Sequence, residues 1–126
     1  MISLGNLGES AVYHDLLKRG HPVYFSMAEG AKFDFISDIN GKLRSIEVKS
    51  SATRNRADTG YVVKIKRSKR KKEEDFDNTR IDILAVYIEP LDKIIYFNAK
   101  LIKQKTAIVI PDVAKVLDFR RSSMLR

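Results

Sequence analysis

The stretch KFDFISDINGKLRSIEVK, from Lys32 to Lys49, decides the fold. Two runs that alternate apolar and polar residues flank Asn40-Gly41, a strong signal for a hairpin with a two-residue type I′ turn. The turn fixes a register in which Ile39 pairs with Lys42. This register gives the hairpin one apolar face, made of Phe33, Phe35, Ile46 and Val48.

Two carboxylates, Asp34 and Glu47, oppose each other on the other face of this predicted hairpin, where Lys49 also lies. Opposed residues have Cβ atoms about 4.5–5.5 Å apart, and opposed like charges destabilise a sheet. With the carbonyl of Val48, the two carboxylates offer hard oxygen ligands that suit Mg²⁺ or Mn²⁺. The alternative is an Asp–Lys–Glu ion-pair cluster on a surface hairpin, which contributes little stability.

A helix is predicted from Ser3 to Arg19, because Gly20 follows it and apolar residues recur at helical spacing. Glu9 lies on the apolar stripe, where an unpaired charge is costly. Either Glu9 closes a capping box with an N-cap at Asn6, or it is a third carboxylate of the metal site. The helix start can approach another backbone closely through Gly5 and Gly8.

The remaining pattern predicts a mixed sheet flanked by helices, in the α/β or α+β class. Strands are expected at Pro22–Met27, Gly60–Lys66, Ile81–Glu89, Lys93–Asn98 and Thr106–Ile110. Short helices are expected at Ala99–Lys105 and Pro111–Phe119, while Arg67–Asn78 fits a helix or a loop. The 126 residues suit one domain spanning residues 1–126.

The positive charge is concentrated in one segment. Ser50–Lys72 carries nine Lys or Arg against one acid, Asp58, which accounts for the whole net charge of +8. Such a block is typical of a protein that binds a polyanion, whereas the alternative is a solvated loop. The predicted nucleic-acid contacts are Ser50, Arg54, Arg56, Lys64, Lys66, Arg67, Lys69, Arg70, Lys71 and Lys72. Most would contact phosphate, with Arg54, Asn55 and Arg56 as candidates for reading bases.

The amino-acid composition bears on the cellular location of the protein and on the kinds of site it can form. There is no cysteine, so disulfides and thiolate metal sites are excluded, and an intracellular, cytoplasmic location is expected. We find no signal peptide at the N-terminus. No stretch reaches the roughly 18 apolar residues of a membrane helix, so no membrane partner is expected.

The order of these motifs resembles a known family. Gly5-x-x-Gly8-Glu9 on a helix, then Phe33-Asp34, then Ile46-Glu47-Val48-Lys49-Ser50 is similar to the PD-(D/E)XK nuclease superfamily. The superfamily includes restriction enzymes, Holliday-junction resolvases and small intron-encoded homing endonucleases. Arg80–Tyr87 and Ile95–Phe97 resemble the strand pair that closes its core. Phe33 departs from the pattern, which has proline there, and nothing after Asn98 matches.

The resemblance implies a restriction-endonuclease-like core of helix, antiparallel strands, a second helix and a parallel strand. It implies Mg²⁺-dependent hydrolysis of DNA phosphodiesters, with Mn²⁺ as a substitute. By position, Glu9, Asp34, Glu47 and Lys49 match the catalytic residues, and Glu9, Asp34, Glu47 and the Val48 carbonyl the metal ligands. A homodimer or homotetramer is implied, because one site cuts one strand. The open alternatives are a site-specific homing or restriction endonuclease, a Holliday-junction resolvase, and a module that binds nucleic acid without cutting.

Overall fold

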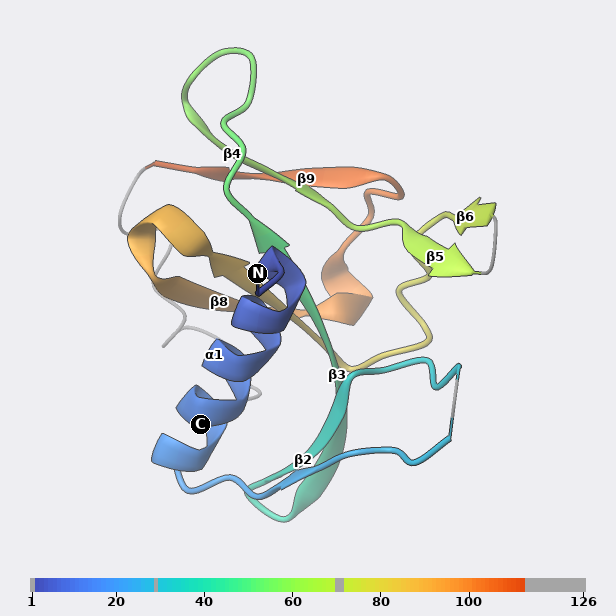
Figure 1. Ribbon diagram of the computed structural model, residues 1–126. Helices are drawn as coiled ribbons and strands as arrows, with labels where there is room; N and C mark the ends of the chain where they lie inside the picture. The colour runs from blue at the N-terminus through green and yellow to red at the C-terminus, as the bar shows by residue number, and fades with distance from the viewer. Residues whose placement is uncertain (1, 29, 70–71, 113–126) are drawn as a thin grey trace.

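A computed structural model describes residues 2–28, 30–69 and 72–112 (Figure 1). The main sheet has five strands in the order β1-β2-β3-β7-β8. Their bounds are β1 Val23–Tyr24, β2 Phe35–Ile39, β3 Lys42–Ser51, β7 Ile83–Ile88 and β8 Lys93–Asn98. Strands β3 and β7 are parallel and the other neighbours are antiparallel. The predicted α+β class with a mixed sheet is confirmed.

The β2–β3 hairpin forms with the predicted turn and register. Ile39 pairs with Lys42, and Asn40 and Gly41 both have positive φ (55° and 85°), as a type I′ turn requires. Strand β3 then changes partners at Ile46, since it pairs with β2 before this residue and with β7 after it. Beyond Ile46, no strand of the described residues lies along the edge of β3 that faced β2.

Helix α1 (Leu4–Lys18) packs on one face of the sheet. Its buried stripe consists of Gly8, Val12 and Leu16, with Glu9 half-buried at the border. The predicted N-cap at Asn6 is wrong, and so is the capping box with Glu9, because the hydroxyl of Ser3 caps the helix by accepting from the Asn6 N–H.

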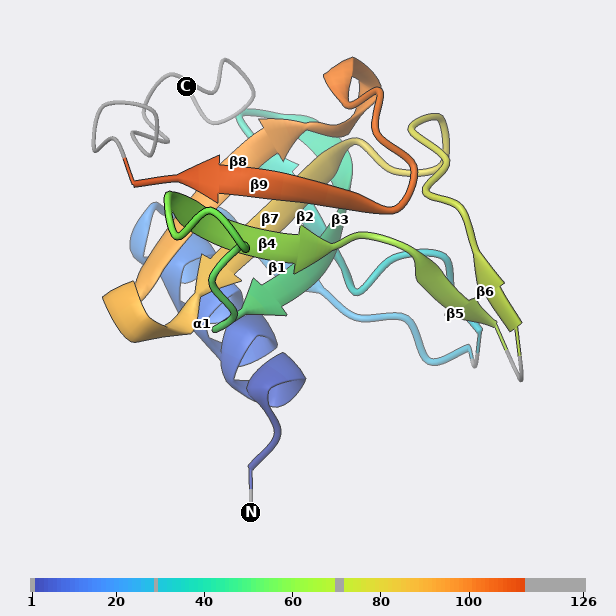
Figure 2. The same ribbon diagram turned by 90° about the horizontal axis from the view of Figure 1, so that it is seen from above.

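The opposite face is covered by a two-stranded ribbon of β4 (Gly60–Lys64) and β9 (Ala107–Pro111). Figure 2 shows this ribbon on the side of the sheet away from α1. Residues from the ribbon, β7 and β8 form the larger hydrophobic cluster, so β7 is buried on both faces as predicted. The second helix that the resemblance implied is absent from the described part of the chain, where strands make the connection from β3 to β7.

The charged segment after β4 forms a short hairpin, β5 (Arg67–Lys69) with β6 (Lys72–Glu74), rather than the predicted helix or loop. One-turn 3₁₀ helices η1 (Glu89–Leu91) and η2 (Ala99–Leu101) follow β7 and β8. Pro111 ends β9 instead of starting a helix, and the rest of the predicted helix at residues 111–119 lies outside the described residues. No helix of the described chain has the length and apolarity needed to cross a membrane.

Candidate active site

Asp34 lies where the β2–β3 ladder stops. The last pair is Phe35 with Ile46, and the Asp34 N–H donates to the carbonyl of that same Ile46 at 2.9 Å. The Asp34 carboxylate Oδ2 accepts from the Val48 N–H at 2.7 Å, in the place that a strand carbonyl would otherwise take. The predicted backbone pair of Asp34 with Glu47 is therefore not formed. Phe33 packs against the hydrophobic cluster on the β4–β9 side, whereas Phe35 belongs to the cluster on the α1 side. The prediction that Phe33 and Phe35 share one face is therefore wrong.

Glu9 reaches Asp34 because α1 approaches β3 closely at Gly8. A Cβ atom at Gly8 would lie only 1.9 Å from the Ser50 Oγ, so only glycine fits this contact. Burial, the negative charge of Asp34 and hydrogen bonding with the Asp34 side chain raise the pKa of Glu9, in that order. A cation beside the two carboxyl groups would oppose the effect of their like charges.

Glu47 is the buried member of the site, with 9% of its surface exposed. Burial raises its pKa most strongly, the Lys49 charge lowers it, the Asp34 charge raises it, and the Arg67 charge lowers it. The Lys49 Nζ lies 3.6 Å from the Glu47 Oε1 and donates to the carbonyl of Lys66 at 3.1 Å. Lys49 is thus held between the buried carboxylate and the chain that leads into β5.

The predicted ligand set is only partly assembled. Within the described residues, no three acidic or histidine side chains converge as a metal-binding group. The reason is that side chains alternate along β3: Ile46 and Val48 face α1, so Glu47 faces the β4–β9 side while Glu9 comes from the helix side. Asp34 lies between the two glutamates and interacts with both.

A divalent ion still fits the Asp34–Glu47 pair. Mg²⁺ usually takes one or two carboxylates and keeps several waters, so a third acid is not needed. The N–H and C=O of a strand residue point to the same edge, so the carbonyl of Val48 points to the edge where Asp34 lies. Two carboxylates and this carbonyl are a suitable donor set for Mg²⁺ or Mn²⁺.

Several cations of the basic segment are already neutralised. Arg54 forms ion pairs with Asp58 at 2.8 Å and Asp112 at 2.6 Å, and its guanidinium lies 4.8 Å from the centre of the Tyr61 ring. This position does not fit the predicted role of Arg54 in reading bases. Lys64 pairs with Glu73, and Lys66 Nζ lies 3.9 Å from Asp75. The acids that follow the basic run therefore offset part of its charge.

Other predicted DNA contacts divide into three groups. Arg56 and Lys72 are exposed and Arg67 is half-buried near Glu47. The Ser50 hydroxyl is buried beside Gly8 and has no hydrogen-bond partner in the described structure, while the residue as a whole is half-buried, so its contact with DNA stays a prediction. Contacts by Lys69, Arg70 and Lys71 lie outside the side chains that the structure describes.

Sequence reasoning missed the Lys66 carbonyl as the anchor of Lys49, because every residue has a carbonyl and no side-chain pattern marks this one.

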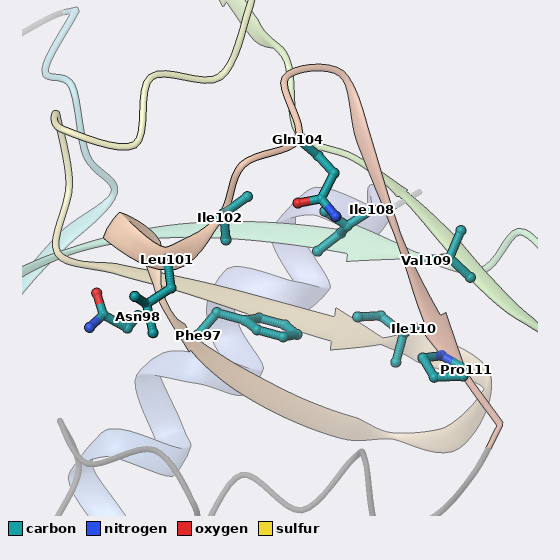
Figure 3. Close-up of a pocket in the computed structure, with 9 residues that line it drawn as sticks. All are labelled: Phe97, Asn98, Leu101, Ile102, Gln104, Ile108, Val109, Ile110 and Pro111. Atoms are coloured by element: carbon teal, nitrogen blue, oxygen red, sulfur yellow. The ribbon is translucent and has the colours of Figure 1, made fainter.

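A separate cavity of about 290 Å³ lies between β8, η2 and β9 (Figure 3). Apolar side chains such as Phe97, Ile108 and Ile110 line it, and none of the candidate acids does. This cavity is therefore separate from the candidate acids beside β3.

Comparisons with known proteins bear on the family and the fold of this chain. The model of the PD-(D/E)XK endonuclease family matches residues 2–118. Among solved structures, the fold is similar to a bacterial homing endonuclease, I-Ssp6803I, with a TM-score of 0.74 and 23% identity over 89% of this chain and 78% of that chain. No match is found among the curated proteins. Because the family model spans most of its length, the chain belongs to the PD-(D/E)XK endonuclease family, which implies a phosphodiester hydrolase.

Proposed function

We propose that the protein is a Mg²⁺-dependent, site-specific DNA endonuclease of the homing or restriction type. The observation that carries this proposal is the arrangement around Glu47: a buried carboxylate beside Asp34 on one side and the Lys49 ammonium on the other. Burying a charge is costly unless a cation neutralises it. A purely structural hairpin gains nothing from this arrangement, whereas a hydrolase gains a place for a cation and a phosphate.

Asp34, Glu47 and the Val48 carbonyl would hold the metal ion, and Mn²⁺ is expected to substitute for Mg²⁺. When bound, the ion supplies charge neutralisation at the phosphate and lowers the pKa of a bound water. Glu9 acts through Asp34 and is therefore a positioning residue.

Lys49 has one ammonium proton directed to the Lys66 carbonyl and a second toward Glu47, which fixes the side chain and leaves a third proton. That proton can donate to a phosphate oxygen and stabilise the charge that develops during hydrolysis.

The proposed DNA partner is held by the cations of the basic segment that remain available, including Arg56 and Lys72. Because each chain has one such site, cutting both strands of a duplex requires two sites. We propose a homodimer or homotetramer, which sedimentation equilibrium would test. A mass equal to one chain, free or bound to DNA, would contradict it.

The test is cleavage of DNA in Mg²⁺, Mn²⁺, Ca²⁺ or EDTA. The substrates are a duplex library with randomised inserts and a four-way junction. We expect duplex cuts at one recurring sequence in Mg²⁺ and Mn²⁺, with no cuts in EDTA. Paired cuts confined to the junction would instead indicate a Holliday-junction resolvase, and binding without cutting would indicate a module that does not cleave.

Two lysine variants make the assignment of Lys49 specific. Lys49→Ala should abolish cleavage while DNA binding in Ca²⁺ persists. Lys100→Ala is the matched control, because Lys100 also pairs with a carboxylate, that of Asp82 at 3.4 Å, but on another part of the sheet. Cleavage by Lys49→Ala at the wild-type rate would refute the assignment.

A further inference from the structure

The chain that enters β5 is attached to the candidate site by its backbone. Lys49 Nζ donates to the Lys66 carbonyl at 3.1 Å, and the next residue, Arg67, begins β5. Figures 1 and 2 show the β5–β6 hairpin projecting on the same side of the molecule as the segment that leads into β2. The position of Arg67 is therefore fixed relative to Lys49.

The Arg67 side chain is half-buried, so it lies against the protein and does not extend freely into solvent. Its charge acts on the Glu47 carboxylate, which the Lys49 ammonium also faces at 3.6 Å.

Arg67 differs from Arg54, an arginine of the same segment whose guanidinium is held by ion pairs. Arg54 has its guanidinium saturated by Asp58 and Asp112. For Arg67, the described residues place no carboxylate at ion-pair distance. The backbone register sets Glu74 opposite Arg67, but the Glu74 carboxylate lies 3.7 Å from Arg80. The Arg67 guanidinium is therefore available to an incoming anion.

We propose that Arg67 is a second cation of the active site, whose guanidinium contacts the scissile phosphate beside the Lys49 ammonium. This inference rests on the proposed nuclease function. The planar guanidinium can donate two parallel hydrogen bonds to phosphate, which an ammonium cannot. Two cations on one side and two carboxylates on the other would hold the phosphate over the metal-binding edge of β3.

Single-turnover cleavage at saturating protein separates this role from general DNA binding. Arg67→Gln should lower the cleavage rate about 10²–10³-fold, the usual effect of losing one preorganised donor. Arg44→Gln is the matched control, because Arg44 is half-buried like Arg67 but its charge acts on Asp82 instead of Glu47. It should cut at the wild-type rate once saturated. Equal rates for the two variants would overturn the proposal.

The conservative variant distinguishes a phosphate contact from mere neutralisation of Glu47. Arg67→Lys keeps the charge but offers only a point contact, so it should recover part of the lost rate. Complete recovery would show that only charge matters and would overturn the proposed paired contact.

An NMR titration of the Glu47 carboxyl carbon requires no cleavage. Arg67→Gln should raise the pKa of Glu47 further, and Arg44→Gln should leave it unchanged. An unchanged pKa in Arg67→Gln would refute the placement of Arg67. A wild-type protein that shows the expected titration but cuts no DNA would instead contradict the proposed function.

Discussion

Helix α1 has no room for a methyl group where it meets β3. A Cβ atom at Gly8 would lie 1.9 Å from the Ser50 Oγ, 3.2 Å from the Ser50 Cβ and 3.4 Å from the Tyr87 Cβ. Rotation of the hydroxyl can relieve the first contact, but the second requires the helix or the strand to move. Gly8→Ala is therefore expected to push the start of α1 away from the sheet.

The expected loss of stability is the difference between two opposing effects. Overpacking costs about 1–3 kcal/mol, while replacing glycine by alanine within a helix contributes about 1 kcal/mol. We expect Gly8→Ala to lower the free energy of unfolding by up to about 2 kcal/mol in urea titrations. Gly5→Ala is the matched control, because its Cβ would meet only the Ser3 Oγ at 3.9 Å, and it should gain stability.

A second substitution at Ser50 identifies the contact. Ser50→Ala removes the hydroxyl that lies nearest to the added methyl group and that has no hydrogen-bond partner itself. Ser50→Ala alone should be neutral or stabilising, because deleting an unsatisfied buried polar group costs little. In the double variant, the part of the loss caused by the Ser50 hydroxyl should disappear, while the part caused by the Ser50 Cβ should remain. Strict additivity of the two changes would refute the close contact.

The same substitution should reduce cleavage, because Gly8 precedes Glu9 and a shift of the helix moves Glu9 away from Asp34. A displacement of about 1 Å can cost about 100-fold in rate, so a shift of a few tenths of an ångström should cost less than this. Single-turnover cleavage, measured well below the unfolding transition, should fall in Gly8→Ala and recover in part in the double variant. Full activity of Gly8→Ala would show that the contact does not position Glu9.

Three further substitutions test other parts of the structure. Burial raises the pKa of Glu47, so ionisation of Glu47 destabilises the folded state. The stability of the wild type relative to Glu47→Gln should therefore fall as the pH rises through the interval above 4.5. The expected fall is about 1.4 kcal/mol per unit of pKa shift. Urea titrations without metal from pH 4 to 7 measure this, and a relative gain by the wild type would contradict it. Tyr96→Phe removes a buried hydrogen bond of 2.6 Å to Asp15 and should cost about 1.5–3 kcal/mol in the same assay. Arg54→Gln should lower the thermal unfolding midpoint but not the saturated cleavage rate, and a lost rate would place Arg54 at the substrate.

The features that sequence predicted are those set by local chemistry. Asn40-Gly41 dictates one turn conformation, and that turn fixes which residues pair across β2 and β3. The apolar run of β7 likewise predicts a strand covered on both faces, and all six of its residues are buried. These predictions needed only neighbours in the chain.

The features that sequence missed depend on contacts between distant segments. The predicted register continued the pairing of β2 with β3 beyond Phe35. Phe33 instead packs against apolar residues on the β4–β9 side, and the chain leaves the β2–β3 ladder. The charged run after Lys66 suggested a helix or a loop, whereas its acids Glu73 and Asp75 pair with Lys64 and Lys66, which precede the run. Neither outcome has a local signal in the sequence.

The position of the site follows from the change of partners along β3. Two aspartates bond to backbone N–H groups at the two edges that this change leaves open. Asp34 accepts from Val48 at 2.7 Å just before β2, and Asp82 accepts from Ser45 at 3.0 Å just before β7. The two carboxylates therefore have the same backbone role on opposite edges of one strand.

Their neighbours make the two aspartates different. Burial works against ionisation of Asp82, but hydrogen bonds from Ser45 and Lys100 outweigh it and hold its pKa below the usual value. At that edge, the negative charge of Asp82 is therefore balanced by its hydrogen-bond donors. Asp34 instead lies among carboxylates, since its charge acts on both Glu9 and Glu47. Of the two edges, the described residues leave the one at Asp34 with a deficit of positive charge, which supports the proposal that a metal ion and a phosphate bind there.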